Sequence, residues 1–162
     1  MSDNPYTPPS APVSDRDPER TGATWKAVLF GVTTDLFGTT IAGMVLLVLF
    51  SGMLVTQGQA QEDISAMLLQ SNQYLFLSLV VGLSFTVLGG YVAARVANHL
   101  EYRHGLIVGV IVLIIGEMMV SGDPTGLPLS IRVIGDLLVV PAALLGAHLR
   151  RAAKRRARTQ VL

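Results

Sequence analysis

Three acidic residues lie inside stretches that are otherwise apolar, and they carry the clearest chemical signal in this sequence. Asp35 occurs in GVTTDLFGTT (residues 31–40), and Glu117 and Asp136 occur in two later apolar stretches. An ionised carboxylate at the centre of a membrane helix costs about 2.5 to 3.5 kcal/mol, a cost that a partner, water or a proton reduces. These residues therefore indicate ion pairs, proton-binding groups or an ion site.

Two arginines are candidate partners, and the first is Arg95. If the first apolar stretch enters the membrane near Lys26, Asp35 lies about 13 Å deep at 1.5 Å per residue. Arg95 is near the inner end of the second stretch, and its side chain leans toward that depth. We weigh an Asp35–Arg95 ion pair against an Arg95 that reaches outward to headgroups, with a proton or ion site at Asp35 as the third interpretation.

Arg132 belongs to a second polar group near the outer surface. Glu117 lies about 7 Å and Asp136 about 11 Å below that surface if the two stretches are joined by a tight turn. Arg132 precedes Asp136 by four residues and so shares its helix face. Two carboxyl groups with one guanidinium would either fasten a helical hairpin or relay a proton. The predicted intramembrane polar cluster is Asp35, Arg95, Glu117, Arg132 and Asp136.

Histidine offers little catalytic signal. His99, Glu101 and His104 in NHLEYRH match neither H-E-x-x-H nor a zinc-finger spacing. The glycines do not form a dinucleotide fingerprint or a Walker A loop, and no Ser-His-Asp grouping is recognisable. We predict no metal site, no cofactor and no enzymatic activity. A membrane enzyme or sensor acting through these three residues stays as a third functional reading.

Four long apolar stretches must position these side chains. The chain has 162 residues, of which 51% are hydrophobic and only 14% charged, and it has no cysteine. Crossing about 30 Å of hydrocarbon takes roughly 20 helical residues. The first stretch follows a long polar segment and exceeds the roughly 7 to 15 residues of a signal-peptide core, which argues against cleavage. The sequence predicts an all-α integral membrane four-helix bundle, with spans at about 25–55, 74–96, 105–120 and 129–149.

The two ends of the chain differ from this membrane domain (residues 25–150). Residues 1–24 are rich in Pro, Ser and Asp, a composition that predicts a disordered tail. Residues 151–162 are basic and compatible with a helix, and we predict a basic cytoplasmic tail that extends the last span as a helix. We expect membrane lipids, and not nucleic acid, as the partner of the basic end. The predicted headgroup-binding residues are Arg150, Arg151, Lys154, Arg155, Arg156 and Arg158.

The distribution of positive charge sets the orientation. All but one of the 12 Lys and Arg residues fall on the side of the chain ends, and Arg132 is the exception. The positive-inside rule then predicts cytoplasmic N and C termini. On the opposite side, Ile64, Met67 and Leu68 are spaced for a short helix. The turn DPTG (residues 123–126) predicts a tight hairpin between the last two spans.

Small residues recur at three-to-four spacing along all four spans. Helices in a bilayer associate through close backbone approach, so such stripes predict the contact faces. Asp35 shares the face of Gly31 and Ala42 and should therefore point into the bundle. The predicted packing glycines are Gly31, Gly38, Gly82, Gly89, Gly90, Gly105, Gly109, Gly116, Gly135 and Gly146.

The runs LGGYVAARVA (residues 88–97) and HGLIVGVIV (residues 104–112) carry a family resemblance. This glycine-rich hairpin resembles small four-span bacterial inner-membrane proteins of uncharacterised function, over about half of the chain. The resemblance implies a four-helix protein of the bacterial inner membrane and carries over no catalytic residues. The three acidic residues are not part of the motif.

Two functions are expected from these observations. The first is a non-enzymatic structural or accessory subunit, which packs through its glycine stripes against copies of itself or a larger membrane complex. The alternative is a proton-coupled transporter or channel component that uses Asp35, Glu117 and Asp136. The two readings differ in whether loss of a carboxylate changes assembly or flux.

Overall fold

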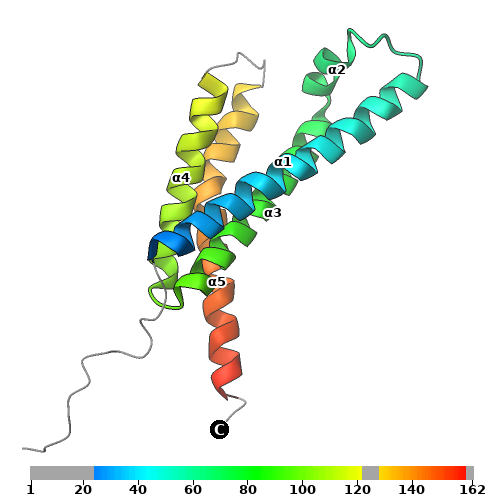
Figure 1. Cartoon of the computed structure of the whole chain (residues 1–162). Helices are drawn as coiled ribbons and strands as arrows, with labels where there is room; N and C mark the ends of the chain where they lie inside the picture. The colour runs from blue at the N-terminus through cyan, green and yellow to red at the C-terminus, as the bar shows by residue number, and fades with distance from the viewer. Residues whose placement is uncertain (1–23, 122–127, 160–162) are drawn as a thin grey trace, which may run out of the picture.

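The structure is a computed structural model that describes residues 24–121 and 128–159, with the side chains of residues 120–121 and 158–159 outside the description. The described part is all-helical, and four of its helices are long and apolar enough to cross a membrane. The predicted fold class is therefore confirmed. The helices are α1 (Thr24–Thr56), α2 (Ile64–Gln70), α3 (Asn72–Ala97), α4 (Glu101–Ser121) and α5 (Leu129–Thr159), shown in Figure 1.

Local sequence explains where these helices begin and end. α3 starts at the N-cap Ser71, whose hydroxyl accepts a hydrogen bond from the Tyr74 amide, and it ends at Asn98 in the left-handed conformation. α5 runs without a break through the basic segment, because Ala, Lys and Arg are strong helix formers. The predicted short outer helix is α2, with Ile64 and Leu68 buried. The expected tail and the DPTG turn lie outside the described residues.

α3 is the central helix. It contacts α1, α2, α4 and α5, whereas α1 and α5 do not touch each other within the described ranges. Its inner half, meaning the half nearer the α3–α4 turn, presents the small, fully buried side chains of Ala93, Ala94 and Ala97. Lipid-exposed helices gain no hydrophobic driving force from one another, so close backbone contact over such residues holds the bundle together.

The predicted packing glycines divide by depth. A Cβ on Gly90 would overlap the Ala143 carbonyl, and one on Gly146 would overlap the backbone of Val87, so α3 and α5 meet backbone to backbone. In the outer half the contacts are loose, and a Cβ on Gly116 would meet nothing within 4 Å. The tightly packed predicted glycines are Gly31, Gly38, Gly89, Gly90, Gly105, Gly109 and Gly146, and the loosely packed ones are Gly82, Gly116 and Gly135.

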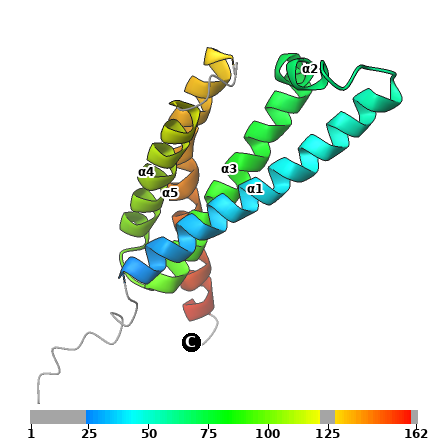
Figure 2. The same cartoon turned by 45° about the horizontal axis from the view of Figure 1, so that its top comes forward.

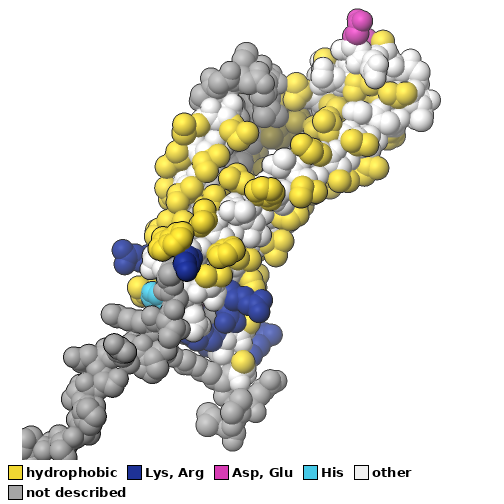
Figure 3. Space-filling model, in the orientation of Figure 1, with side chains coloured by type: hydrophobic (Ala, Val, Ile, Leu, Met, Phe, Trp, Pro, Cys, Tyr) yellow, Lys and Arg dark blue, Asp and Glu magenta, His cyan; other side chains and the backbone are white. Residues whose placement is uncertain are grey.

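The helices consequently form two arms. α1 with α3 and α4 with α5 diverge from a common base toward the end that carries α2 (Figure 2). Lys and Arg side chains gather at the base, and acidic side chains stand out at the α2 end (Figure 3). The base holds the start of α1, the α3–α4 turn and the last turns of α5. This arrangement places both ends of the described chain on the positively charged side.

Candidate functional site

Asp35 points into the bundle, as its place in the small-residue stripe predicts. Only 2% of the residue is exposed, although it lies eleven residues, or about 16 Å, along α1 from Thr24. Its Cβ lies against Gly89 of α3, where only a glycine leaves room. Its carboxyl group lies within reach of the Thr86 hydroxyl, but the oxygen Oδ1 has no hydrogen-bond partner among the described residues. A buried carboxylate oxygen without a donor is a costly arrangement.

The structure does not bring Asp35 and Arg95 together. Asp35 faces Thr86, and Arg95 lies nine residues, or about 14 Å, further along α3 toward the base. Arg95 is exposed, and the described residues contain no ion pair between the two. The estimate of depth from Lys26 was too coarse to reveal this, because the register of α1 against α3 is set by the Gly31–Gly89 contact.

A cavity of about 420 Å³ lies between the two arms and receives side chains from all four long helices. Asp35 and Thr86 lie toward its inner end, Ser78 and Met119 toward its outer end, and Asp136 on the α5 wall. Its remaining wall is mainly apolar. Sequence reasoning did not find this cavity. The hydroxyl-rich composition around Asp35 was the available signal, since Thr39 and Thr40 of that segment also line it.

Glu117, Arg132 and Asp136 lie together near the outer ends of α4 and α5. Arg132 Nε donates to Glu117 Oε1 at 3.2 Å, and a second guanidinium nitrogen donates to Glu117 Oε2. This bidentate geometry is the strong form of an arginine–carboxylate pair. Asp136 is within hydrogen-bonding reach of Glu117. The ion pair joins α4 to α5, and of the two carboxyl groups only that of Asp136 lines the cavity.

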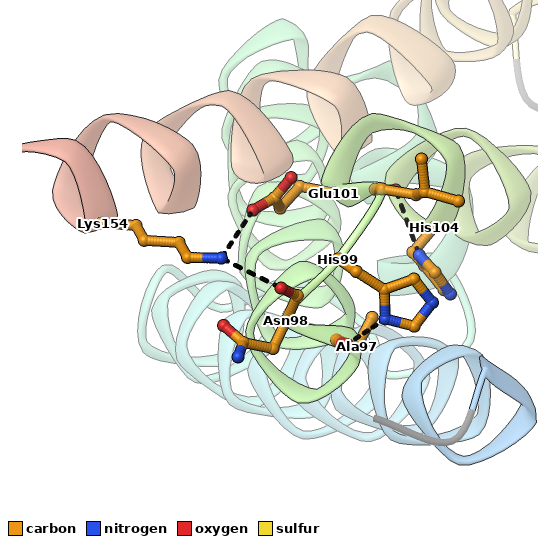
Figure 4. Close-up of polar contacts among 7 residues, drawn as sticks. Ala97, Asn98, His99, Glu101, His104 and Lys154 are labelled. Atoms are coloured by element: carbon orange, nitrogen blue, oxygen red, sulfur yellow. Dashed lines mark hydrogen bonds and ion pairs between the residues drawn. The ribbon is translucent and has the colours of Figure 1, made fainter. Parts of the chain in front are cut away.

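A second polar contact joins α5 to the α3–α4 turn at the base (Figure 4). Lys154 Nζ donates to the Asn98 carbonyl at 3.0 Å and lies 3.7 Å from Glu101 Oε1. Asn98 has a φ of 56°, a conformation that asparagine tolerates better than most residues. The ammonium group of Lys154 thus makes contacts within the protein at this turn, whereas the sequence predicted it to bind lipid headgroups.

His99 in this turn and His104 in the first turn of α4 both contact backbone carbonyl groups. His99 Nδ1 lies 2.6 Å from the Ala97 carbonyl, and His104 Nδ1 lies 3.1 Å from the Leu100 carbonyl (Figure 4). Their rings meet edge to face at 5.4 Å. Within the described ranges no group of three His, Cys, Asp or Glu residues is placed to hold a metal ion.

The basic end of α5 forms a shallow site at the base. A cavity of about 290 Å³ is lined by Tyr102, His148, Arg151 and Arg155. The Tyr102 hydroxyl lies 2.8 Å from His148 Nδ1, and the Arg151 guanidinium lies 5.3 Å from the centre of the Tyr102 ring. Arg156 is exposed, Arg150 is half-buried, and the side chain of Arg158 lies outside the description. Arginine beside tyrosine is a combination suited to headgroups at a membrane surface.

Comparison with known proteins adds no relative. No protein-family model, curated protein or solved structure matches this chain. The resemblance to small four-span bacterial proteins therefore stays a prediction.

Proposed function

We propose that this chain is a non-enzymatic accessory subunit of a membrane complex and associates through helix packing. The observation that supports it is the contrast between the halves of α1. Ala27 and Gly31 in the inner half are buried against the bundle. In the outer half, a Cβ on Gly43 or Gly52 would meet nothing within 4 Å, and the surrounding large apolar side chains are exposed.

Lipid explains the exposed apolar side chains but not the two glycines. Glycine makes a helix about 1 kcal/mol less stable than alanine does, and contact with acyl chains does not offset this loss of stability. Contact with another helix can offset the loss, because small residues allow the two backbones to approach closely. Gly43 and Gly52 are nine residues, or two and a half helical turns, apart and therefore lie on opposite sides of α1. The outer half of α1 thus fits helix contacts on two sides, supplied by copies of this chain or by a larger complex.

Gentle purification tests this proposal. The full chain is isolated in mild detergent, and every co-purifying protein and the molecular mass of the particle are determined. We expect a stoichiometric companion or a homo-oligomer, which Gly43→Leu and Gly52→Leu should dissociate. Val110→Leu is the control, because Val110 is 41% exposed, already bulky, and lies on α4 outside the proposed contact. A monomer without a companion, unchanged by the glycine variants, contradicts the proposal.

Proton-coupled transport is the second candidate, and one observation favours it. Asp35 and Asp136 line the same cavity from α1 and α5, so two carboxyl groups face one intramembrane space. Ionisable residues at such positions commonly bind protons or substrates. Under this reading Asp35→Asn abolishes flux while the protein still accumulates. Under the subunit reading the same change lowers assembly or abundance and causes no specific flux defect.

Membrane lipids complete the proposed set of partners. The basic residues at the base, with Arg151 over Tyr102, support binding of anionic headgroups on the cytoplasmic face of a bacterial inner membrane. Both chain ends would then be cytoplasmic. We propose no nucleic-acid partner and no cofactor.

A further inference from the structure

We propose that the cavity between the two arms binds a protonated amine that carries a compact apolar group, with Asp35 as its counter-ion. This inference goes beyond the subunit proposal and does not depend on it. If the transport reading holds, the inference names the class of its substrate.

The size of the cavity suits a small organic molecule. Binding sites for such molecules usually measure about 300 to 1,000 Å³ and are mainly apolar with a few placed polar groups. This cavity measures about 420 Å³, and its apolar wall includes Leu79, Leu83 and Met119. The loosely packed Gly82, Gly116 and Gly135 provide the space, because none carries a side chain that fills it.

Asp35 supplies the reason for an amine. Its oxygen Oδ1 is buried and has no donor among the described residues. The hydroxyl of Thr86 also bonds to the Gly82 carbonyl at 3.2 Å, and its single proton can serve only one acceptor. An ammonium group brings both N–H donors and positive charge, and charge-assisted hydrogen bonds are about twice as strong as neutral ones.

The protein provides no cation of its own at this wall. Among the described residues that line the cavity there is no Lys, Arg or His. Arg132 is bound to Glu117, and Arg95 lies toward the base. A positive charge that complements an ionised Asp35 would therefore come from a ligand.

An inorganic cation fits less well than an amine. Metal ions and K⁺ need several oxygen ligands to replace their hydration shells. Here the carboxyl groups of Asp35 and Asp136 lie on different helices, and the other side-chain oxygens of the wall are hydroxyls scattered among aliphatic side chains. The apolar part of an organic amine makes use of those side chains, whereas a bare ion does not. Asp136 on the facing wall adds a weaker attraction, because Arg132 interacts electrostatically with it.

Equilibrium binding to the purified full chain in lipid nanodiscs tests the site. The probe is radiolabelled 1-adamantylamine, a compact cage with one amino group, and empty nanodiscs correct for partition into lipid. Its neutral isostere, 1-adamantanol, serves as the competitor. We expect saturable binding that the alcohol displaces at least about tenfold less well than unlabelled amine, since it lacks the charge. Equal displacement by the alcohol overturns the proposal and identifies a purely apolar slot.

Two variants locate the site independently. Asp35→Asn keeps the shape but removes the charge and should weaken amine binding at least about tenfold. Gly116→Leu keeps the charge but fills the cavity and should abolish binding. Glu62→Gln, an exposed carboxylate outside the cavity, and Val110→Leu, an exposed position on α4, are the matched controls.

Unchanged binding in either test variant overturns the proposal. If Asp35→Asn does not accumulate, Gly116→Leu and the comparison of amine with alcohol still decide the question. A failure here leaves the subunit proposal intact, because that proposal is tested by association and by Gly43 and Gly52.

Discussion

Gly31 of α1 and Gly89 of α3 bring these two helices into backbone contact. A Cβ on Gly31 would lie 2.8 Å from the Gly89 carbonyl oxygen, and one on Gly89 would lie 2.7 Å from the Gly31 carbonyl oxygen. Real Cβ atoms do not approach this closely, so both positions need glycine. This reciprocal contact sets the register of α1 on α3 and thereby places Asp35 opposite Thr86.

Gly89→Ala should destabilise the bundle. The added methyl group overpacks the contact at a cost of about 1 to 3 kcal/mol, against a gain in helix propensity of about 1 kcal/mol. We expect a lower midpoint temperature for heat-induced loss of monodisperse protein in detergent. Gly116→Ala is the control, since its new Cβ meets open space and the midpoint should hold or rise. Equal midpoints for the two variants would contradict this packing.

The orientation of the chain can be read by labelling, because the sequence has no cysteine and any introduced thiol is the only one. Ser65 on α2 and Ala153 on α5 are exposed at opposite ends of the molecule. In intact spheroplasts a membrane-impermeant maleimide should modify Ser65→Cys and spare Ala153→Cys, and lysis should expose both. Labelling of Ala153→Cys before lysis would overturn the proposed cytoplasmic position of the C terminus.

Lys154 should hold the α3–α4 turn in place. Lys154→Met removes the donor to the Asn98 carbonyl and the partner of Glu101, so amide hydrogen exchange over residues 98–104 should accelerate. Arg156→Met removes an exposed cation from the same helix and should leave that exchange unchanged. If amide hydrogen exchange over these residues is the same in both variants, the turn is stabilised by the positive charge at the end of α5 and not by the specific Lys154 contact.

Much of the fold could be predicted from the sequence, because hydrophobic length is a local property. Blocks of apolar residues locate the four long helices, and the Ile64–Leu68 spacing locates α2. Small-residue periodicity also predicts that Asp35 faces inward. The predicted helical extension at the basic end is confirmed as well, since α5 continues through that segment to Thr159.

The candidate site was predictable only in part, since it depends on how helices are offset and tilted. The proximity of Glu117 and Arg132 follows from a short connection between two spans, and the structure places them in contact. Arg95 and Asp35 belong to helices joined by a long segment, so no local rule sets their relative height. The cavity forms because the two arms diverge. They diverge where the close glycine contacts along α3 and α4 are replaced by looser ones.

The Glu117–Arg132 pair should show energetic coupling that weakens with salt. Both side chains are about one-third exposed, at 38% and 34%, so mobile ions can screen them. In a cycle of Glu117→Gln, Arg132→Gln and the double variant, the double change should cost less stability than the sum of the single changes. Arg132→Gln should be the more harmful single change, because it leaves Glu117 beside Asp136 without the intervening cation. The coupling and its salt dependence are measured from the midpoint temperatures of heat denaturation in detergent at low and high salt. Additive effects of the two single changes at both salt concentrations would show that the pair does not stabilise the contact between α4 and α5.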